Sequence, residues 1–187
     1  KWSADDTSIV FVRETGGDKG IYTMDANGAH VTEVIDLAGI NEQDPSWSPD
    51  GTRITYNTHG DTIEGLYIVD VDGSNNEYLT SMGSGGTSWA PDGNSIAYAG
   101  NGISVVIIST TVVTSITDYD SSEGHDYGPG WSPTESDILL FCRRGNDYSN
   151  IYFADLADNN ALTAVTSTTD DHYINPSWFP DGNKIIF

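Results

Sequence analysis

The chain has 187 residues and a formal net charge of −21, because 28 Asp and Glu stand against seven Lys and Arg. This balance excludes the basic face that nucleic acids and anionic membrane surfaces require, while cationic partners and divalent metals remain permitted. No stretch has the length of a membrane-spanning helix, so membrane insertion is not expected, and the single cysteine excludes an internal disulfide.

Repeated units follow one another along the chain, and each opens on a tryptophan. Every proline lies two residues before or after one of these tryptophans. The repeat length of 42 to 47 residues, with several short strands in each repeat, is typical of β-propeller blades. The five tryptophans are Trp2, Trp47, Trp89, Trp131 and Trp178.

The first two units carry the predicted strands in the same order. After Trp2 we expect strands at residues 9–11, 20–25 and 31–34, with an Asn27-Gly28 turn before the last of them. In the second unit, Pro49-Asp50-Gly51 is a tight turn after the first strand, since Pro fixes φ and Gly accepts a positive φ. The strands of the second unit are predicted at residues 44–47, 53–57, 66–70 and 77–80.

The later units depart from this pattern. The third lacks the usual Tyr and Asp in its strand at residues 103–108, and the fourth replaces the turn with residues 133–137. The chain ends on a fifth, partial unit with a strand at residues 184–187. The sequence therefore predicts an all-β fold, a propeller of four-stranded antiparallel blades with four full repeats plus a partial fifth. The recurring Trp is predicted to pack between blades, and Cys142 to be a buried small hydrophobe.

The motifs of the second unit closely resemble the repeats of TolB-like β-propellers. They are the run from Asp44 to Gly51, the strand 66–70 and the pair Asp72-Gly73. Relatives of this kind include a periplasmic propeller that docks protein partners, propellers that gate serine peptidases, and sugar-acid lyases. The resemblance implies a bacterial or archaeal origin and a periplasmic or extracellular location.

Known relatives close with six or seven blades, so residues 1–187 form one propeller domain or a fragment of one. An irregular ring of about five blades, or a ring completed by self-association through the incomplete blades, are the alternatives. An unpaired apolar strand at either end of such a chain is exposed to edge-to-edge association.

Candidate binding residues precede the first strand of each unit, at residues 41–44, 84–87, 125–128 and 171–175. In a propeller these segments meet at one mouth of the central channel, where convergent polar groups form a binding site for a peptide, a sugar or a divalent cation. Solvated loop residues would give the same pattern. His30 and His59 are expected in hairpin turns elsewhere, without a specific role. The candidates are Glu42, Gln43, Asp44, His125, Asp126, Tyr127, Asp171, His172 and Tyr173.

No nucleophile elbow or phosphate-binding glycine motif is present, so we expect a non-catalytic binding or scaffold protein that recognises a protein partner or small ligand. No cofactor is expected, although a divalent cation remains open. One alternative is a metal-dependent lyase in which His125 and His172 hold the metal. The mouth segments contain no Lys or Arg to neutralise an acidic sugar, which disfavours this alternative. The other is a gating propeller of a serine peptidase.

Overall fold

The computed structural model describes residues 1–59, 64–81, 86–118, 124–145 and 147–187, and these residues form strands and turns with no helix among them. The candidate residues 84 and 85 lie outside this range. The chain divides into two compact units, Lys1–Met82 and Gly83–Phe187, which are described separately. Over the described ranges there is accordingly no helix with the length and apolarity needed to cross a membrane.

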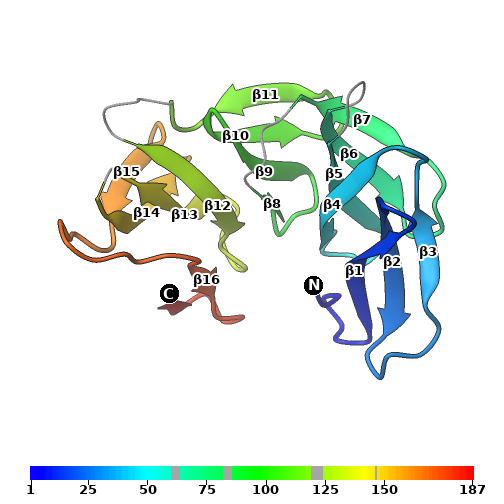
Figure 1. Cartoon of the computed structure of the whole chain (residues 1–187). Coiled ribbons are helices and arrows are strands. Elements are labelled where there is room, and N and C mark those ends of the chain that lie inside the picture. The colour runs from blue at the N-terminus through cyan, green and yellow to red at the C-terminus, as the bar shows by residue number, and fades with distance from the viewer. Residues whose placement is uncertain (60–63, 82–85, 119–123, 146) are drawn as a thin grey trace. The chain divides into compact units, whose positions relative to one another are not determined.

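The first compact unit contains two antiparallel groups of strands (Figure 1). One group has the order β1-β2-β3 and the other β4-β5-β6-β7, and a single parallel pair, Lys19 with Asn41, connects them. The first repeat therefore has three strands and one isolated bridge, Trp2 with Ile9, rather than the full blade expected. The strands are β1 (Ser8–Thr15), β2 (Asp18–Asp25), β3 (Thr32–Ile35), β4 (Asn41–Trp47), β5 (Arg53–His59), β6 (Gly65–Asp70) and β7 (Glu77–Thr80).

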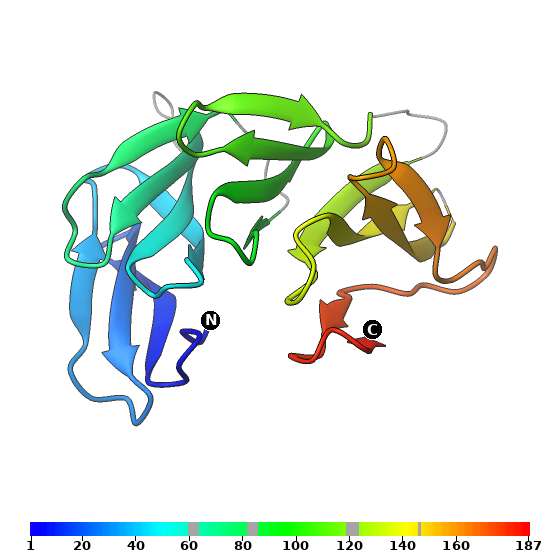
Figure 2. The same cartoon turned by 180° about the vertical axis from the view of Figure 1, so that it is seen from behind.

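The second compact unit contains two four-stranded antiparallel sheets and a two-stranded one, seen from behind in Figure 2. The first of these sheets has the order β8-β9-β10-β11 and the second the order β12-β13-β14-β15, so both are up-and-down blades as predicted. The strands are β8 (Thr87–Trp89), β9 (Ser95–Gly100), β10 (Gly102–Ile107), β11 (Val112–Ser115), β12 (His125–Trp131), β13 (Ile138–Arg144), β14 (Ser149–Asp155), β15 (Ala161–Ala164), β16 (Ser177–Trp178) and β17 (Ile185–Ile186).

Buried side chains between successive sheets form the core of each compact unit. In the first unit, Ile54 and Tyr56 of β5 pack with Val10 of β1 and Ile21 of β2. All four side chains are inaccessible to solvent. In the second unit, Trp131 packs with a cluster that includes the fully buried Phe141.

The recurring tryptophans differ in burial. Trp89 and Trp131 are buried, Trp47 and Trp178 are half-buried, and Trp2 is exposed. Trp47, Trp131 and Trp178 pack against side chains of the preceding sheet, which confirms the predicted packing role for these three. Cys142 is fully buried, as the sequence predicted.

The Pro-Asp-Gly turn is held by its aspartate. Asp50 Oδ1 accepts hydrogen bonds from the Ser48 hydroxyl at 2.6 Å, from the Thr52 amide at 3.0 Å and from the Thr52 hydroxyl at 2.8 Å. These donors hold the pKa of the Asp50 carboxyl down at about 2. Gly51 adopts a φ of 71°, as the predicted turn requires. Asp5 repeats the arrangement with Ser3 and Thr7 in the first repeat.

Candidate functional site

The candidate residues lie beside a repeated irregularity in the first strand of each repeat. Three residues before Trp47, Trp89, Trp131 and Trp178 the backbone has a left-handed φ between 51° and 88°. In β4 and β12 the pairing register also shifts at this point, which is the signature of a β-bulge. Only Gly, Asn and Asp adopt this conformation at low cost, and the four positions are Asp44, Gly86, Gly128 and Asn175.

Glu42, Gln43 and Asp44 lie together on β4 of the first compact unit, but their surroundings differ. Glu42 is fully buried, Gln43 is half-buried and Asp44 is exposed. Asp44 Oδ2 accepts a hydrogen bond from Asn57 Nδ2 at 3.3 Å, across the β4–β5 pair. Asp44 is therefore the carboxylate of this group that faces solvent.

The buried carboxyl of Glu42 has an internal role. Its Oε1 accepts a hydrogen bond from the Leu37 amide at 3.2 Å and so fixes the connection between β3 and β4. Burial raises the pKa of Glu42 to about 7, and the nearby carboxylates of Asp36 and Asp18 add to the rise. Its Oε2 has no hydrogen-bond partner among the described residues. Glu42 was expected among the exposed binding residues, but its side chain is buried instead.

Asp126, on β12 of the second compact unit, is also buried, and it forms an ion pair inside the protein. Its two oxygens accept hydrogen bonds from Arg143 Nε at 2.7 Å and from Arg143 Nη2 at 2.8 Å. The Arg143 guanidinium also lies 5.2 Å from the ring centre of Tyr152. With side-chain exposures of 3% for Asp126 and 15% for Arg143, this is a buried, fork-to-fork ion pair.

His172, Tyr173 and Tyr127 meet around β13 and β14. Residues 171–173 run alongside β14, where Ser149 and Tyr173 share a backbone hydrogen bond. His172 Nδ1 lies 3.3 Å from the Ser149 hydroxyl, and the Cys142 thiol donates to the Tyr173 carbonyl oxygen at 3.4 Å. Burial raises the pKa of Tyr127 to about 12, and its hydroxyl also interacts with Cys142 and Ser149. Burial likewise raises the pKa of the Cys142 thiol, so it is not an activated nucleophile.

The structure therefore brings the candidates of the second compact unit together, on β12 and in the segment that runs beside β14. His125 and His172 are exposed, Tyr127 and Tyr173 are half-buried against the same cluster, and Asp171 is exposed at its edge. In the described ranges, no group of three or more His, Cys, Asp or Glu is placed to hold a metal ion. The convergence of these residues with Glu42, Gln43 and Asp44 at one mouth stays a prediction.

Sequence reasoning missed two functional candidates, Arg143 and Arg144, because they lie at the end of β13 rather than in a mouth segment. Antiparallel pairing puts Arg143 opposite Asp126 and Arg144 opposite His125. The mouth segments themselves contain no Lys or Arg, as stated from the sequence, but strand pairing brings two arginines of β13 next to one of them. The signal was present in the sequence, as two of seven Lys and Arg stand side by side at the end of a predicted strand.

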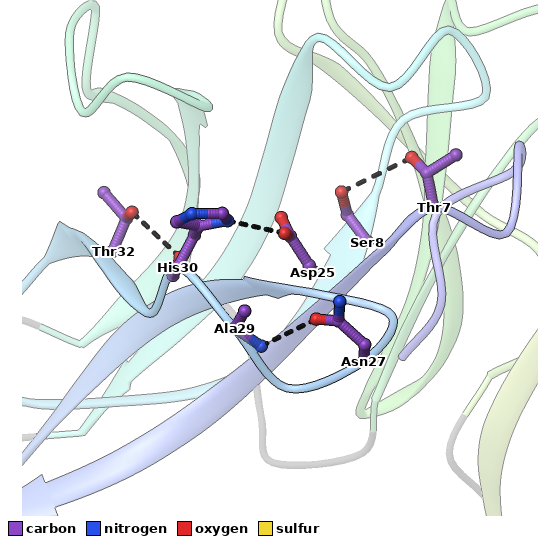
Figure 3. Close-up of polar contacts among 7 residues, drawn as sticks. All are labelled: Thr7, Ser8, Asp25, Asn27, Ala29, His30 and Thr32. Carbon is purple, nitrogen blue, oxygen red and sulfur yellow. Dashed lines mark hydrogen bonds and ion pairs between the residues drawn. The ribbon is translucent and has the colours of Figure 1, made fainter.

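The remaining two histidines lie in the first compact unit. His30 follows the turn between β2 and β3, where its Nδ1 lies 2.6 Å from Asp25 Oδ2 and its carbonyl oxygen accepts from Thr32 (Figure 3). Its turn location is as predicted. His59 is instead the last residue of β5, with Nδ1 3.6 Å from Glu64 Oε1.

A cavity of about 230 Å³ lies apart from the candidate residues, also in the first compact unit. It is lined by the Pro-Asp-Gly turn of the second repeat and by the matching turn of the first, including Asp5, Asp50 and Trp47. Both aspartates are occupied by the hydrogen bonds that hold their own turns. The cavity is thus a feature of turn packing in this unit.

Comparison with known proteins agrees with the repeat pattern. Residues 1–100 match the family model of the TolB beta propeller domain. Over 53 residues the chain is 42% identical to the Tol-Pal system protein TolB of Francisella tularensis, a match that covers 28% of this chain and 12% of that protein.

Solved structures show the same fold. TolB from Acinetobacter baumannii aligns with a TM-score of 0.80 and 18% identity, over 100% of this chain and 47% of that one. A putative TolB from Agrobacterium tumefaciens aligns with a TM-score of 0.78 and 22% identity, over 99% of this chain and 66% of that one. An oligogalacturonate lyase in complex with manganese aligns with a TM-score of 0.73 and 17% identity, over 98% and 56% of the two chains.

At these identities the structural matches establish the fold alone. This chain also spans less than half the length of TolB from Acinetobacter baumannii. The family model, however, covers more than half of the chain and includes its first two repeats. From this match and from the Pro-Asp-Gly turns that follow Trp47, Trp89 and Trp178, the chain belongs to the TolB β-propeller family.

Proposed function

We propose that this chain is a non-catalytic binding propeller, or a segment of one, that recognises a protein partner through the strand ends carrying the candidate residues. The observation that carries the proposal is that some polar side chains around β12 and β13 are buried in an ion pair while others are exposed. Asp126 and Arg143 are locked together inside, while His125, Arg144 and His172 are exposed on the same sheet. A surface of exposed polar side chains on a rigid sheet is suited to recognition.

The chemistry of the buried groups supports binding rather than catalysis. Catalytic groups need a proton affinity matched to their task and access to substrate. Tyr127 and Cys142 instead have raised pKa values because of burial. Membership of the TolB family supports a protein as the ligand and export to the periplasm as the location. The likeness to an oligogalacturonate lyase extends to the fold and carries no activity to this chain.

The proposal is tested by site-specific photo-crosslinking. A photoreactive residue is placed at position 172 or 43, and the protein is exposed to envelope proteins of a bacterium with a Tol-Pal system. The matched control carries the same residue at position 112 on β11, where Val112 is 53% exposed. We expect a discrete crosslinked species from positions 172 and 43 and none from position 112.

Two results would overturn the proposal. The first is an equal yield of the same species from position 112, which would show that contact is not specific to the candidate surface. The second is measurable turnover of oligogalacturonate in the presence of manganese, which would make the chain an enzyme.

A further inference from the structure

The antiparallel register of the β12–β15 sheet lines up three residues at one level, and a parallel bridge adds a fourth. His125 of β12 lies opposite Arg144 of β13, and Arg144 lies opposite Ser149 of β14. Ser149 in turn forms a bridge with His172. Directly opposite residues place their side chains on the same face of a sheet, with Cβ atoms about 5 Å apart. We call these four residues the His125–His172 row.

The exposed members of the row are a cation and two imidazoles. His125, Arg144 and His172 are exposed, and Ser149 is buried beneath them. The ion pairs of the described residues do not include Arg144. The neighbouring Arg143 points to the other face, where it is neutralised by Asp126. Strand alternation therefore directs one arginine of the pair inward and the other to solvent.

Tyr127 extends the row on the same face, two residues along β12 from His125. Burial raises the pKa of Tyr127 to about 12, and the positive charge of Arg144 opposes that rise. The register places Tyr127 diagonally across from Arg144, since Tyr127 lies opposite Cys142. The row consequently carries several donors around one permanent positive charge.

We propose that the His125–His172 row is a docking point for a carboxylate group of the protein partner, with the Arg144 guanidinium as the main donor. This inference rests on the proposed function and names the chemistry of the same surface. A guanidinium matches a carboxylate in a two-bond fork, and the exposed imidazole of His172 adds a donor at its side. Asp147 and Asp171 lie close to members of the row in the sequence. Their negative charges would repel a ligand with several carboxylates, so the row fits a single carboxylate better than a polyanion.

The net charge of −21 does not forbid such a contact. Charges farther away than about 8 Å are largely screened at physiological ionic strength. A contact with one guanidinium is therefore governed by its immediate surroundings, and it weakens as salt is added.

Calorimetry with two synthetic peptides tests the inference. One peptide is Gly-Gly-Glu-Gly-Gly and the other is Gly-Gly-Gln-Gly-Gly, both capped at their ends so that the central side chain is the difference. We expect the Glu peptide to bind and Arg144→Gln to weaken its binding by about 10-fold. Arg144→Lys, which keeps the charge without the fork, is expected to fall in between. The matched control Arg13→Gln removes one exposed positive charge from the other compact unit and is expected to leave binding unchanged.

The outcomes separate this inference from the proposed function. Equal binding of the two peptides, or of the Glu peptide to Arg144→Gln and the native chain, would overturn carboxylate docking. If crosslinking from position 172 persisted in that case, the proposed function would stand without it. A third ligand is galacturonate blocked at its anomeric carbon. If it bound more tightly than the Glu peptide and its binding were lost in Arg144→Gln, the carboxylate would come from a sugar and the inference of a protein partner would be overturned.

Discussion

Asp126 and Arg143 form a two-bond ion pair across β12 and β13, in which Asp126 is almost fully buried and Arg143 is mostly buried. The pair fixes the strand end that carries His125 and Arg144. Burying two charges is costly, but removing one of them is costlier, because the other then remains without its partner.

We predict that Asp126→Ala lowers the free energy of unfolding by about 3–5 kcal/mol, because Arg143 loses its carboxylate. The double variant Asp126→Ala with Arg143→Met is expected to recover most of this loss. Urea denaturation measures both variants. The control Asp25→Ala removes the exposed partner of His30 and should cost below about 1 kcal/mol. Equal costs for Asp126→Ala and Asp25→Ala would contradict a buried pair.

Glu42 is predicted to make stability depend on pH. Its folded pKa of about 7 lies above the ordinary value of 4.5, so the folded state binds the proton more tightly. Its contribution is complete below about pH 4.5 and is lost as the pH rises to about 7, a change of roughly 3 kcal/mol.

The variant Glu42→Gln cannot ionise and should lack this decline, so that it is more stable than the native chain at pH 8. Denaturation midpoints between pH 4.5 and 8 measure the effect. Glu14→Gln, at an exposed position on β1, is the matched control and should keep the native pH dependence. Parallel curves for Glu42→Gln and the native chain would show that Glu42 does not titrate in this range.

Because the backbone of Asp44 is left-handed, we predict that glycine destabilises the chain less than alanine does at this position. Asp44→Gly is expected to lie within about 0.5 kcal/mol of the native chain, because glycine adopts a φ of 51° without strain. Asp44→Ala is expected to cost about 1–2 kcal/mol. At the equivalent Gly128, an added Cβ would meet no atom within 4 Å, so Gly128→Ala isolates backbone strain and should cost about the same. An Asp44→Ala variant as stable as Asp44→Gly would contradict this account.

Phe141 is predicted to be the side chain on which the second compact unit depends for packing. It is fully buried and stacks on Tyr152, with ring centres 5.7 Å apart. Phe141→Ala should lower the free energy of unfolding by about 3–5 kcal/mol, since it removes a large ring from a packed cluster. Phe179→Ala, at a 43% exposed position, is the control and should change it by less than about 0.5 kcal/mol. Similar losses for both variants would contradict the assigned core.

The sequence by itself determined the repeat and the local structure of each strand and turn. Trp, Pro-Asp-Gly and alternating apolar residues act over a few positions, and their effects on φ and on burial are local. The left-handed position three residues before Trp47, Trp89, Trp131 and Trp178 is filled only by Asp, Gly or Asn, so the sequence also favours that conformation.

The tertiary structure alone decided which candidates are buried and what they contact. Glu42 and Asp126 are polar and stand a few residues before a recurring Trp in the sequence, just as Asp44 and His125 do. Their burial depends on strand register and on the neighbouring sheet, which pair residues 17 positions apart in the case of Asp126 and Arg143. Alternation along β13 then separates Arg143 from Arg144, and a register shift of one residue would exchange their roles.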